Sequence, residues 1–179
     1  KVLWEKTNPA DELNRIDLSL RCLFLDDGKN RVLVETGMGD KLEDDFSAMF
    51  NVIQPKHPIQ AKLDDIGYKM ADITHVIITH LHFDHAGGAT TLDGDGNLIP
   101  AFPNAVYYIS ESNWEAGVNP SPRDSASYLD LNFLPLQKAG KLELVKENSV
   151  IMDGVSTITV NGHTNGQQLV KVESERDVL

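Results

Sequence analysis

Four side chains of the kinds that bind metal ions lie within six consecutive residues. They are His80, His82, Asp84 and His85. Neutral imidazole and carboxylate are good ligands for zinc, and also for iron or manganese. A lone histidine is more often a surface residue or a hydrogen-bonded core residue than a ligand. Four such side chains beside an apolar run would be costly to bury without a partner, so the spacing predicts a metal site rather than incidental histidines.

The residues before this cluster indicate how it would be held. Val76-Ile77-Ile78 is an apolar run that predicts a buried strand, and the cluster follows where that strand leaves its sheet. Because extended backbone alternates its faces, His80 and His82 point the same way, while Leu81 and Phe83 point back toward the core.

The residues after the strand complete the predicted cavity. A turn beyond Phe83 would bring Asp84 and His85 to the same side as the first two histidines. Gly87 and Gly88 follow them and lack a Cβ, so backbone can pass close to whatever the cluster holds.

Two segments resemble the signatures of one family of hydrolases. The pattern His80-x-His82-x-Asp84-His85 resembles that of the metallo-β-lactamase-fold hydrolases, and residues 161–166, Asn-Gly-His-Thr-Asn-Gly, are similar to a second motif of that superfamily. The longer strings Thr79–Gly88 and Trp4–Arg15 look most like the lactonase branch, which includes quorum-quenching acyl-homoserine lactonases. The resemblance runs over nearly the whole chain, and the two histidine motifs are its specific part.

The resemblance implies a set of metal ligands. His80, His82 and His163 would hold a first ion, and three histidines plus a water complete a catalytic zinc shell. Asp84 and His85 would belong to a second ion. Zinc is the expected metal, with iron, manganese or cobalt as alternatives. In the family, an Asp that bridges the two ions and a last His lie further along the chain, beyond these 179 residues. We therefore expect the second site to be weak or empty in this chain alone.

The resemblance also implies an activity, that of a lactonase-like metal-dependent hydrolase. A metal-bound hydroxide would open a lactone such as an acyl-homoserine lactone, with Asp84 as the catalytic residue that orients the nucleophile and protonates the leaving alkoxide. The expected partner is then a small-molecule ester. Hydrolysis of a β-lactam, a thioester or a phosphotriester is the alternative within the fold. A metal-binding or assembly module without catalysis is the alternative from another class.

Composition limits the classes of binding partner and the cellular compartment that we expect for this protein. The chain is 24% charged and 41% hydrophobic, which is ordinary for one soluble domain. Its net charge of −11 disfavours nucleic acid, whose binding depends on neutralising phosphates. No apolar run has membrane-spanning length and no signal pattern begins the chain, so we expect a cytoplasmic protein with no membrane partner. Cys22 is the only cysteine and is expected to be a buried thiol.

The two ends suggest a piece of a longer protein. The sequence begins without a Met and stops inside an apolar stretch, Val178-Leu179. We expect residues 1–179 to be the N-terminal part of a single metallo-β-lactamase-like domain. By resemblance the fold class is α/β (α+β), an αββα sandwich that is incomplete at its C-terminus. Missing strands would expose an apolar sheet face, which favours a homodimer.

Periodicity and turn chemistry predict the remaining elements. Alternation over 15–24 and a return at 31–35 predict a hairpin. Helices are expected at 41–50 and 59–66, around Trp114 with a capping box from Ser112 to Glu115, and from Asp124 until Pro135. Further strands are expected at 75–79, 104–109, 142–145, 156–160 and 168–172.

Some side chains keep two interpretations. Glu35 stands where the family commonly has an Asp that supports the metal loops, and it is either such a support or a plain strand-end carboxylate. His57 is interpreted as a surface residue, and His75, at the far end of its strand, is left outside the site. Four aromatic residues either pack in the core, which we favour, or line the substrate cleft, and these are Trp4, Trp114, Tyr128 and Phe133.

Overall fold

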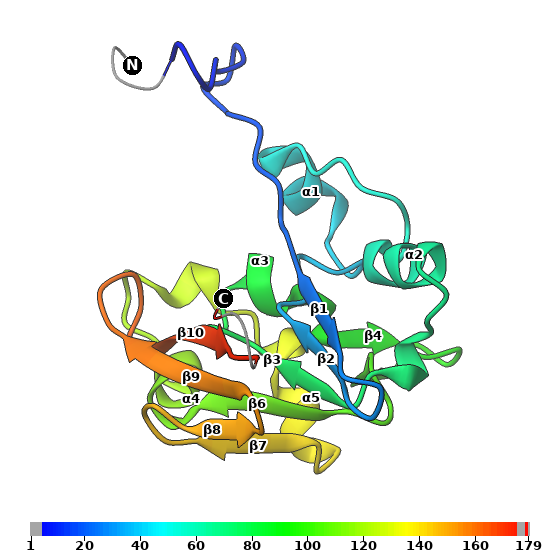
Figure 1. Ribbon diagram of the computed structural model, residues 1–179. Coiled ribbons are helices and arrows are strands. Elements are labelled where there is room, and N and C mark those ends of the chain that lie inside the picture. The colour runs from blue at the N-terminus through cyan, green and yellow to red at the C-terminus, as the bar shows by residue number, and fades with distance from the viewer. Residues whose placement is uncertain (1–4, 175–177, 179) are drawn as a thin grey trace.

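The computed structural model describes residues 5–174 and 178, and a five-stranded sheet lies at its centre (Figure 1). The strand order is β1-β2-β3-β6-β7. Its members are β1 (Leu23–Asp26), β2 (Arg31–Val34), β3 (His75–Ile77), β6 (Val106–Ser110) and β7 (Leu142–Val145). β1 and β2 form an antiparallel hairpin, and the neighbours from β2 to β7 run parallel. The predicted hairpin and the predicted strands of this sheet are confirmed, apart from residues 15–22 of segment 15–24.

A second, antiparallel sheet packs against one face of the first. It contains β8 (Val150–Met152), β9 (Val155–Val160) and β10 (Gln167–Val172), in the order β10-β9-β8. The strands predicted at 156–160 and 168–172 are thus confirmed. A separate hairpin of β4 (Thr90–Leu92) and β5 (Leu98–Pro100) turns at Asp93, whose side chain accepts hydrogen bonds from the backbone of its own loop.

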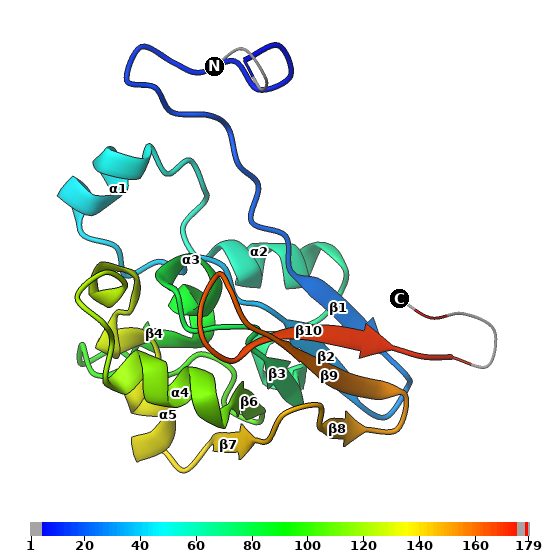
Figure 2. The same cartoon turned by 90° about the vertical axis from the view of Figure 1, so that its left-hand side faces the viewer.

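Helices cover the other face of the five-stranded sheet (Figure 2). They are α2 (Pro58–Asp65), α3 (Phe83–Ala86), α4 (Glu111–Val118) and α5 (Leu134–Lys138). The remaining helix, α1 (Asp44–Phe50), lies further from the sheet, gives no residue to this core and packs on Phe83 of α3. The helices predicted at 41–50, at 59–66 and around Trp114 are present. Among the described helices, none has the length and apolar character needed to cross a bilayer.

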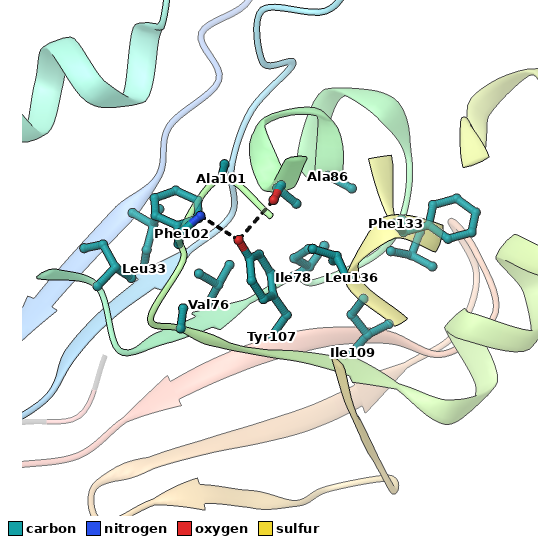
Figure 3. Close-up of a cluster of buried hydrophobic side chains, with 14 of the residues drawn as sticks. Leu33, Val76, Ile78, Ala86, Ala101, Phe102, Tyr107, Ile109, Phe133 and Leu136 are labelled. Atoms are coloured by element: carbon teal, nitrogen blue, oxygen red, sulfur yellow. Dashed lines mark hydrogen bonds between the residues drawn. The ribbon is translucent and has the colours of Figure 1, made fainter. Parts of the chain in front are cut away.

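The central sheet separates two hydrophobic cores, and β2 shows how. Leu33 faces the helices and joins the larger core with Val76 and Tyr107, whereas Val32 and Val34 face the second sheet. This follows from the alternation of side chains along a strand. In the larger core the hydroxyl of Tyr107 accepts a hydrogen bond from the backbone N–H of Phe102 and donates one to the carbonyl of Ala89 (Figure 3).

The described residues thus form three layers, helices on sheet on sheet. This mixed α/β arrangement confirms the predicted fold class. The outer face of the second sheet carries exposed apolar side chains, including Ile158 at 43% and Leu169 at 52% exposure. No helix among the described residues covers it. Self-association through this face stays a prediction.

The prediction of a strand over 15–24 is wrong for its first eight residues. Residues 5–21 run away from the body of the protein in both views (Figures 1 and 2). Ile16 and Leu18 alternate as a strand would, but they are exposed and have no neighbouring strand in the described part of the chain. Alternation fixes which way side chains point, while a strand also needs a partner for its backbone.

Two helix ends also differ from the predictions. The side chain of Ser110, not Ser112, caps α4 by accepting a hydrogen bond from the backbone N–H of Asn113 at 3.1 Å, because β6 runs directly into the helix. No long helix begins at Asp124. That segment forms two 3-10 turns, Ser125–Ser127 and Asp130–Asn132, and Pro135 lies in the first turn of α5 instead of ending a helix.

Candidate metal centre

Three histidines from two distant loops meet beyond the C-terminal end of β3. His80 and His82 lie between β3 and α3, and His163 lies between β9 and β10. One ring nitrogen of each lies within 4.8 Å of those of the other two. The ring centroid of His163 is 4.9 Å from that of His80 and 4.9 Å from that of His82. Three nitrogens at this separation can share one metal ion.

Burial leaves nitrogen atoms of this group unpaired. His80 and His82 are 1% and 8% exposed, and in the described part of the chain Nε2 of each is buried without a hydrogen-bond partner. An unpaired buried polar atom is costly, whereas a cation would satisfy both. Burial lowers the pKa of His80 to about 3, with repulsion from His82 and His163 adding to the effect. Burial and then His163 lower the pKa of His82. Both rings are therefore neutral at pH 7, which is the form that binds metals.

Asp84 and His85 form a second group beside the first. Both lie in the single turn of α3, which directly follows His82. The ring of His85 lies 4.0 Å from that of His80 between centroids, and its Nε2 is 3.4 Å from Oδ2 of Asp84. Burial lowers the pKa of His85. A carboxylate oxygen and a neutral imidazole nitrogen thus face each other next to the three histidines, and they suit a second cation.

Glu35 holds this second group in place. One carboxylate oxygen accepts a hydrogen bond from the backbone N–H of Thr79 at 2.7 Å, and the other is hydrogen-bonded to Nδ1 of His85. Since Nδ1 is engaged, Nε2 is the nitrogen of His85 that is left to face Asp84. Glu35 thus contacts the loop that carries the candidate ligands, as expected of a supporting residue and not of a plain strand-end carboxylate.

Glycines let the loop after β2 lie directly against α3 and its neighbours. A Cβ at Gly87 would overlap the backbone of Met38, one at Gly88 the carbonyl of Thr36, and one at Gly39 the carbonyl of Gly87. The backbone at Gly87 and Gly88 is therefore closely approached, but by the loop after β2. An approach of this backbone to whatever the cluster holds stays a prediction.

Aromatic residues near the site divide into two sets. Trp114 and Phe133 pack edge to face in the larger core, 5.6 Å apart, as favoured from the sequence. Tyr128 is buried in the same core, yet its ring also lies 4.8 Å from that of His82 and its hydroxyl contacts Thr164, the residue after His163. Trp4 lies outside the described residues.

Phe83 differs from the prediction that it points back into the core. It is half-buried and packs on α1, with its ring centroid 4.9 Å from that of Phe46 and 5.2 Å from that of Phe50. Leu81 is fully buried in the core as predicted. The reason is that α3 begins at Phe83, so the strand-like alternation ends one residue earlier.

The two remaining histidines lie away from the centre. His75 stands at the start of β3 and stacks on Tyr108 at 5.7 Å, and His57 is exposed at the start of α2 with its ring hydrogen-bonded to Asp40. Neither belongs to the group of three among the described residues.

The sequence is similar to known hydrolases. A family model described as the metallo-beta-lactamase superfamily matches residues 18–179. An N-acyl homoserine lactonase of Bacillus cereus is 29% identical over 175 residues, which cover 93% of this chain and 63% of that protein. A probable metallo-hydrolase of Mycobacterium tuberculosis is 26% identical over 183 residues, covering 90% of this chain and 56% of the relative. This chain thus spans about three fifths of the length of the curated relatives it matches.

Solved structures agree with the sequence comparison. A probable metal-dependent hydrolase from Staphylococcus aureus superposes with a TM-score of 0.89 at 27% identity, covering 99% of this chain and 62% of that one. An N-acyl homoserine lactone hydrolase with the product N-hexanoyl-L-homoserine at its catalytic metal centre gives 0.67 at 25% identity, covering 96% and 66%. With the family model matching nearly the whole chain, this protein belongs to the metallo-beta-lactamase superfamily.

Proposed function

We propose that this protein is a metal-dependent hydrolase that opens lactones of the acyl-homoserine type. The observation that carries the proposal is the pair of buried Nε2 atoms on His80 and His82, which have no partner in the described chain and stand beside His163. Buried nitrogens without partners are expected where a cation completes the structure. If these rings only packed in the fold and bound no cation, the free-energy cost of removing both Nε2 atoms from water would not be offset.

Each ligand residue has a place in this proposal. His80, His82 and His163 would hold the first ion, and Asp84 with His85 would contribute to a second. Zinc is the metal that three histidines favour, with iron, manganese or cobalt as alternatives. When bound, zinc supplies Lewis-acid chemistry that lowers the pKa of water to about 7.

Asp84 is the proposed catalytic residue. Its carboxylate, half-buried at the start of α3, would orient the attacking water toward the lactone carbonyl and accept its proton. As the new carbon–oxygen bond forms and the ring ester bond breaks, Asp84 would return that proton to the leaving alkoxide. The product is a hydroxy acid. Glu35 would fix the His85 ring from its Nδ1 side, so that Nε2 faces the same space as the Asp84 carboxylate and both groups could contribute to the second ion.

The proposed substrate carries an apolar acyl chain. Phe83 stands between His82 and Asp84 in the sequence, and with Phe46 and Phe50 it forms an aromatic cluster next to the ligands. Apolar surface of this kind favours a hydrocarbon chain by roughly 0.8 kcal/mol for each buried CH₂. The Bacillus cereus relative named as an N-acyl homoserine lactonase, and the structure with N-hexanoyl-L-homoserine at its metal centre, support the same substrate class.

The test measures bound zinc and lactone opening on the purified chain. Wild-type protein should bind zinc and hydrolyse an acyl-homoserine lactone, and His80→Ala should lose both together. His75→Ala is the matched control, because His75 lies at the start of β3, the strand that leads to His80, but stacks on Tyr108 outside the site, and it should keep both. Full turnover by metal-free His80→Ala would rule the mechanism out.

Rates on rival substrates separate the alternatives. A lactone, a thioester, a β-lactam and a phosphotriester should be compared side by side, and the proposal requires the lactone to be the fastest. Bound zinc without turnover of any of the four would favour a metal-binding module, which is relevant because this chain spans 63% of its Bacillus cereus relative.

A further inference from the structure

We propose that Asn113 is a positioning residue that joins the two histidine-bearing loops and thereby sets the affinity for metal. The inference rests on the proposed metal binding by His80, His82 and His163. Asn113 belongs to α4, an element that contributes no ligand, and it is fully buried.

The side chain of Asn113 makes one hydrogen bond to each loop. Its Oδ1 accepts from the backbone N–H of Leu81 at 2.8 Å, and Leu81 lies between His80 and His82. Its Nδ2 donates to the carbonyl of Asn165 at 2.7 Å, two residues after His163. One loop presents a donor and the other an acceptor, so a carboxamide is the side chain of this size that satisfies both.

The local structure brings Asn113 and the second loop together. Ser110 caps α4 and accepts from the backbone N–H of Asn113, which places the carboxamide in the first turn of the helix. A Cβ at Gly166 would overlap the backbone nitrogen of Asn113 and Oγ of Ser110, and Gly166 also has a φ of +68°. Only glycine therefore lets the loop after β9 lie against this turn.

The loop between β9 and β10, which carries His163, is also held by contacts that do not involve Asn113. Thr164 contacts the hydroxyl of Tyr128 and lies 3.5 Å from Nδ2 of Asn113, and the backbone N–H of Gln168 donates to the carbonyl of Thr79 at 2.9 Å. The carboxamide is the contact that reaches the backbone between the two histidines of the first loop.

Loss of this link should separate the ligands more than it destabilises the fold. His163 is the exposed member of the group of three, and it follows Gly162, whose φ of +142° few other residues adopt. Without the bond to Asn165, the imidazole of His163 would no longer be held near those of His80 and His82. Zinc would then have to order the loop on binding, which lowers affinity.

The experiment compares two substitutions of Asn113 with a buried control. Asn113→Asp can still accept from Leu81 but places an oxygen against the carbonyl of Asn165, and Asn113→Ala removes both bonds. Tyr107→Phe removes buried hydrogen bonds to Phe102 and Ala89, away from the metal loops. Zinc dissociation constants come from competition with a chromophoric chelator, and urea unfolding without metal reports stability.

Both Asn113 variants should bind zinc at least about 10-fold more weakly than wild type, as is typical for groups that orient metal ligands. The visible absorption of bound Co²⁺ should change as well. Tyr107→Phe should lose stability while its zinc affinity stays within about twofold of wild type, since its loss lies in the core. Folded Asn113→Asp that binds zinc as tightly as wild type, or no more weakly than Tyr107→Phe, would overturn the proposal.

A measurement without metal separates this inference from the proposed function. In the metal-free protein, hydrogen exchange at the Leu81 amide should be at least about 10-fold faster in Asn113→Ala than in wild type, because its acceptor is gone. If wild type binds no zinc, the proposed metal function fails, and the Leu81 exchange rate still decides whether Asn113 holds the loop. Should Asn113→Ala fail to fold, Asn113→Asp provides the zinc comparison. An unchanged Leu81 exchange rate in a folded Asn113→Ala would refute the link.

Discussion

Among single residues, Glu35 determines which nitrogen of His85 is free to bind. Because the carboxylate of Glu35 engages Nδ1, we expect the metal-free imidazole to carry its proton on Nδ1 and to keep a lone pair on Nε2. Burial lowers the pKa of His85, so the neutral ring should dominate at pH 7.5. Long-range ¹H–¹⁵N correlation spectra distinguish the two tautomers directly.

The matched variant for this prediction is Glu35→Gln. Its amide can still accept from the backbone N–H of Thr79 but lacks the charge that favours the Nδ1 proton, so a mixture of tautomers is expected. An Nε2-protonated His85 in the wild-type protein would contradict this assignment.

Cys22 gives a prediction about pH and reactivity. The thiol is half-buried against the larger core, and burial raises its pKa from 9.0 to about 11. A raised thiol pKa lowers the thiolate fraction at pH 8, and the thiolate is the species that reacts, so alkylation by iodoacetamide should be about 100-fold slower in the folded chain than in urea. Equal rates in the two states would show that the thiol is not held in the core.

Residue types revealed the candidate ligands, but not the groups that hold them. His80, His82, Asp84, His85 and His163 stand out because few other roles explain such spacing. Asn113, Phe46 and Phe50 lie on helices far away in sequence, where an amide or an aromatic residue is unremarkable by itself. Their roles depend on where those helices pack, which periodicity does not specify.

At the level of elements, the loop between β2 and α1 packs tightly against the segment that follows α3. This packing predicts that a methyl group added at Gly88 lowers the free energy of unfolding. A Cβ at Gly88 would overlap the carbonyl of Thr36, which belongs to backbone and cannot move aside. Gly88→Ala should therefore lower the free energy of unfolding by about 1–3 kcal/mol, measured by urea denaturation. Gly94→Ala is the control, since nothing lies within 4 Å of a Cβ there. Similar losses in both variants would show that tight packing at Gly88 is not the cause.

Strands and helices were predicted correctly where the local sequence pattern was matched by a neighbouring element for the segment to pack or pair with. The strands β2, β3, β6, β7, β9 and β10 and the helix α2 lie within about two residues of their predicted positions. Segment 15–22 has the same alternation but no neighbouring strand in the described chain, so its pattern alone was insufficient. Between Asp124 and Pro135, short 3-10 turns bring Tyr128 against His82, a tertiary contact that outweighs helical spacing.

Across the whole molecule, the candidate metal centre links the two sheets. His80 and His82 follow β3 of the five-stranded sheet, whereas His163 connects β9 and β10 of the other. The core between the sheets is the smaller of the two, with Val32, Val34, Ile77 and Val155 as its fully buried members among the described residues. Burial of this small core stabilises the contact between the two sheets only in part. An ion shared by the two loops would therefore stabilise that contact further.

Zinc should consequently raise the stability of the whole domain. A ligand that binds only the folded state at 100 times its dissociation constant adds about 2.7 kcal/mol to the free energy of unfolding. Urea titrations at fixed free zinc should show this gain in wild type and in His75→Ala, whose ring lies outside the centre. His163→Ala should lose most of it at the same zinc concentration, because the remaining ligands all belong to one loop beside the first sheet. A gain in His163→Ala equal to that of wild type would mean that zinc, where it binds, does not connect the two sheets.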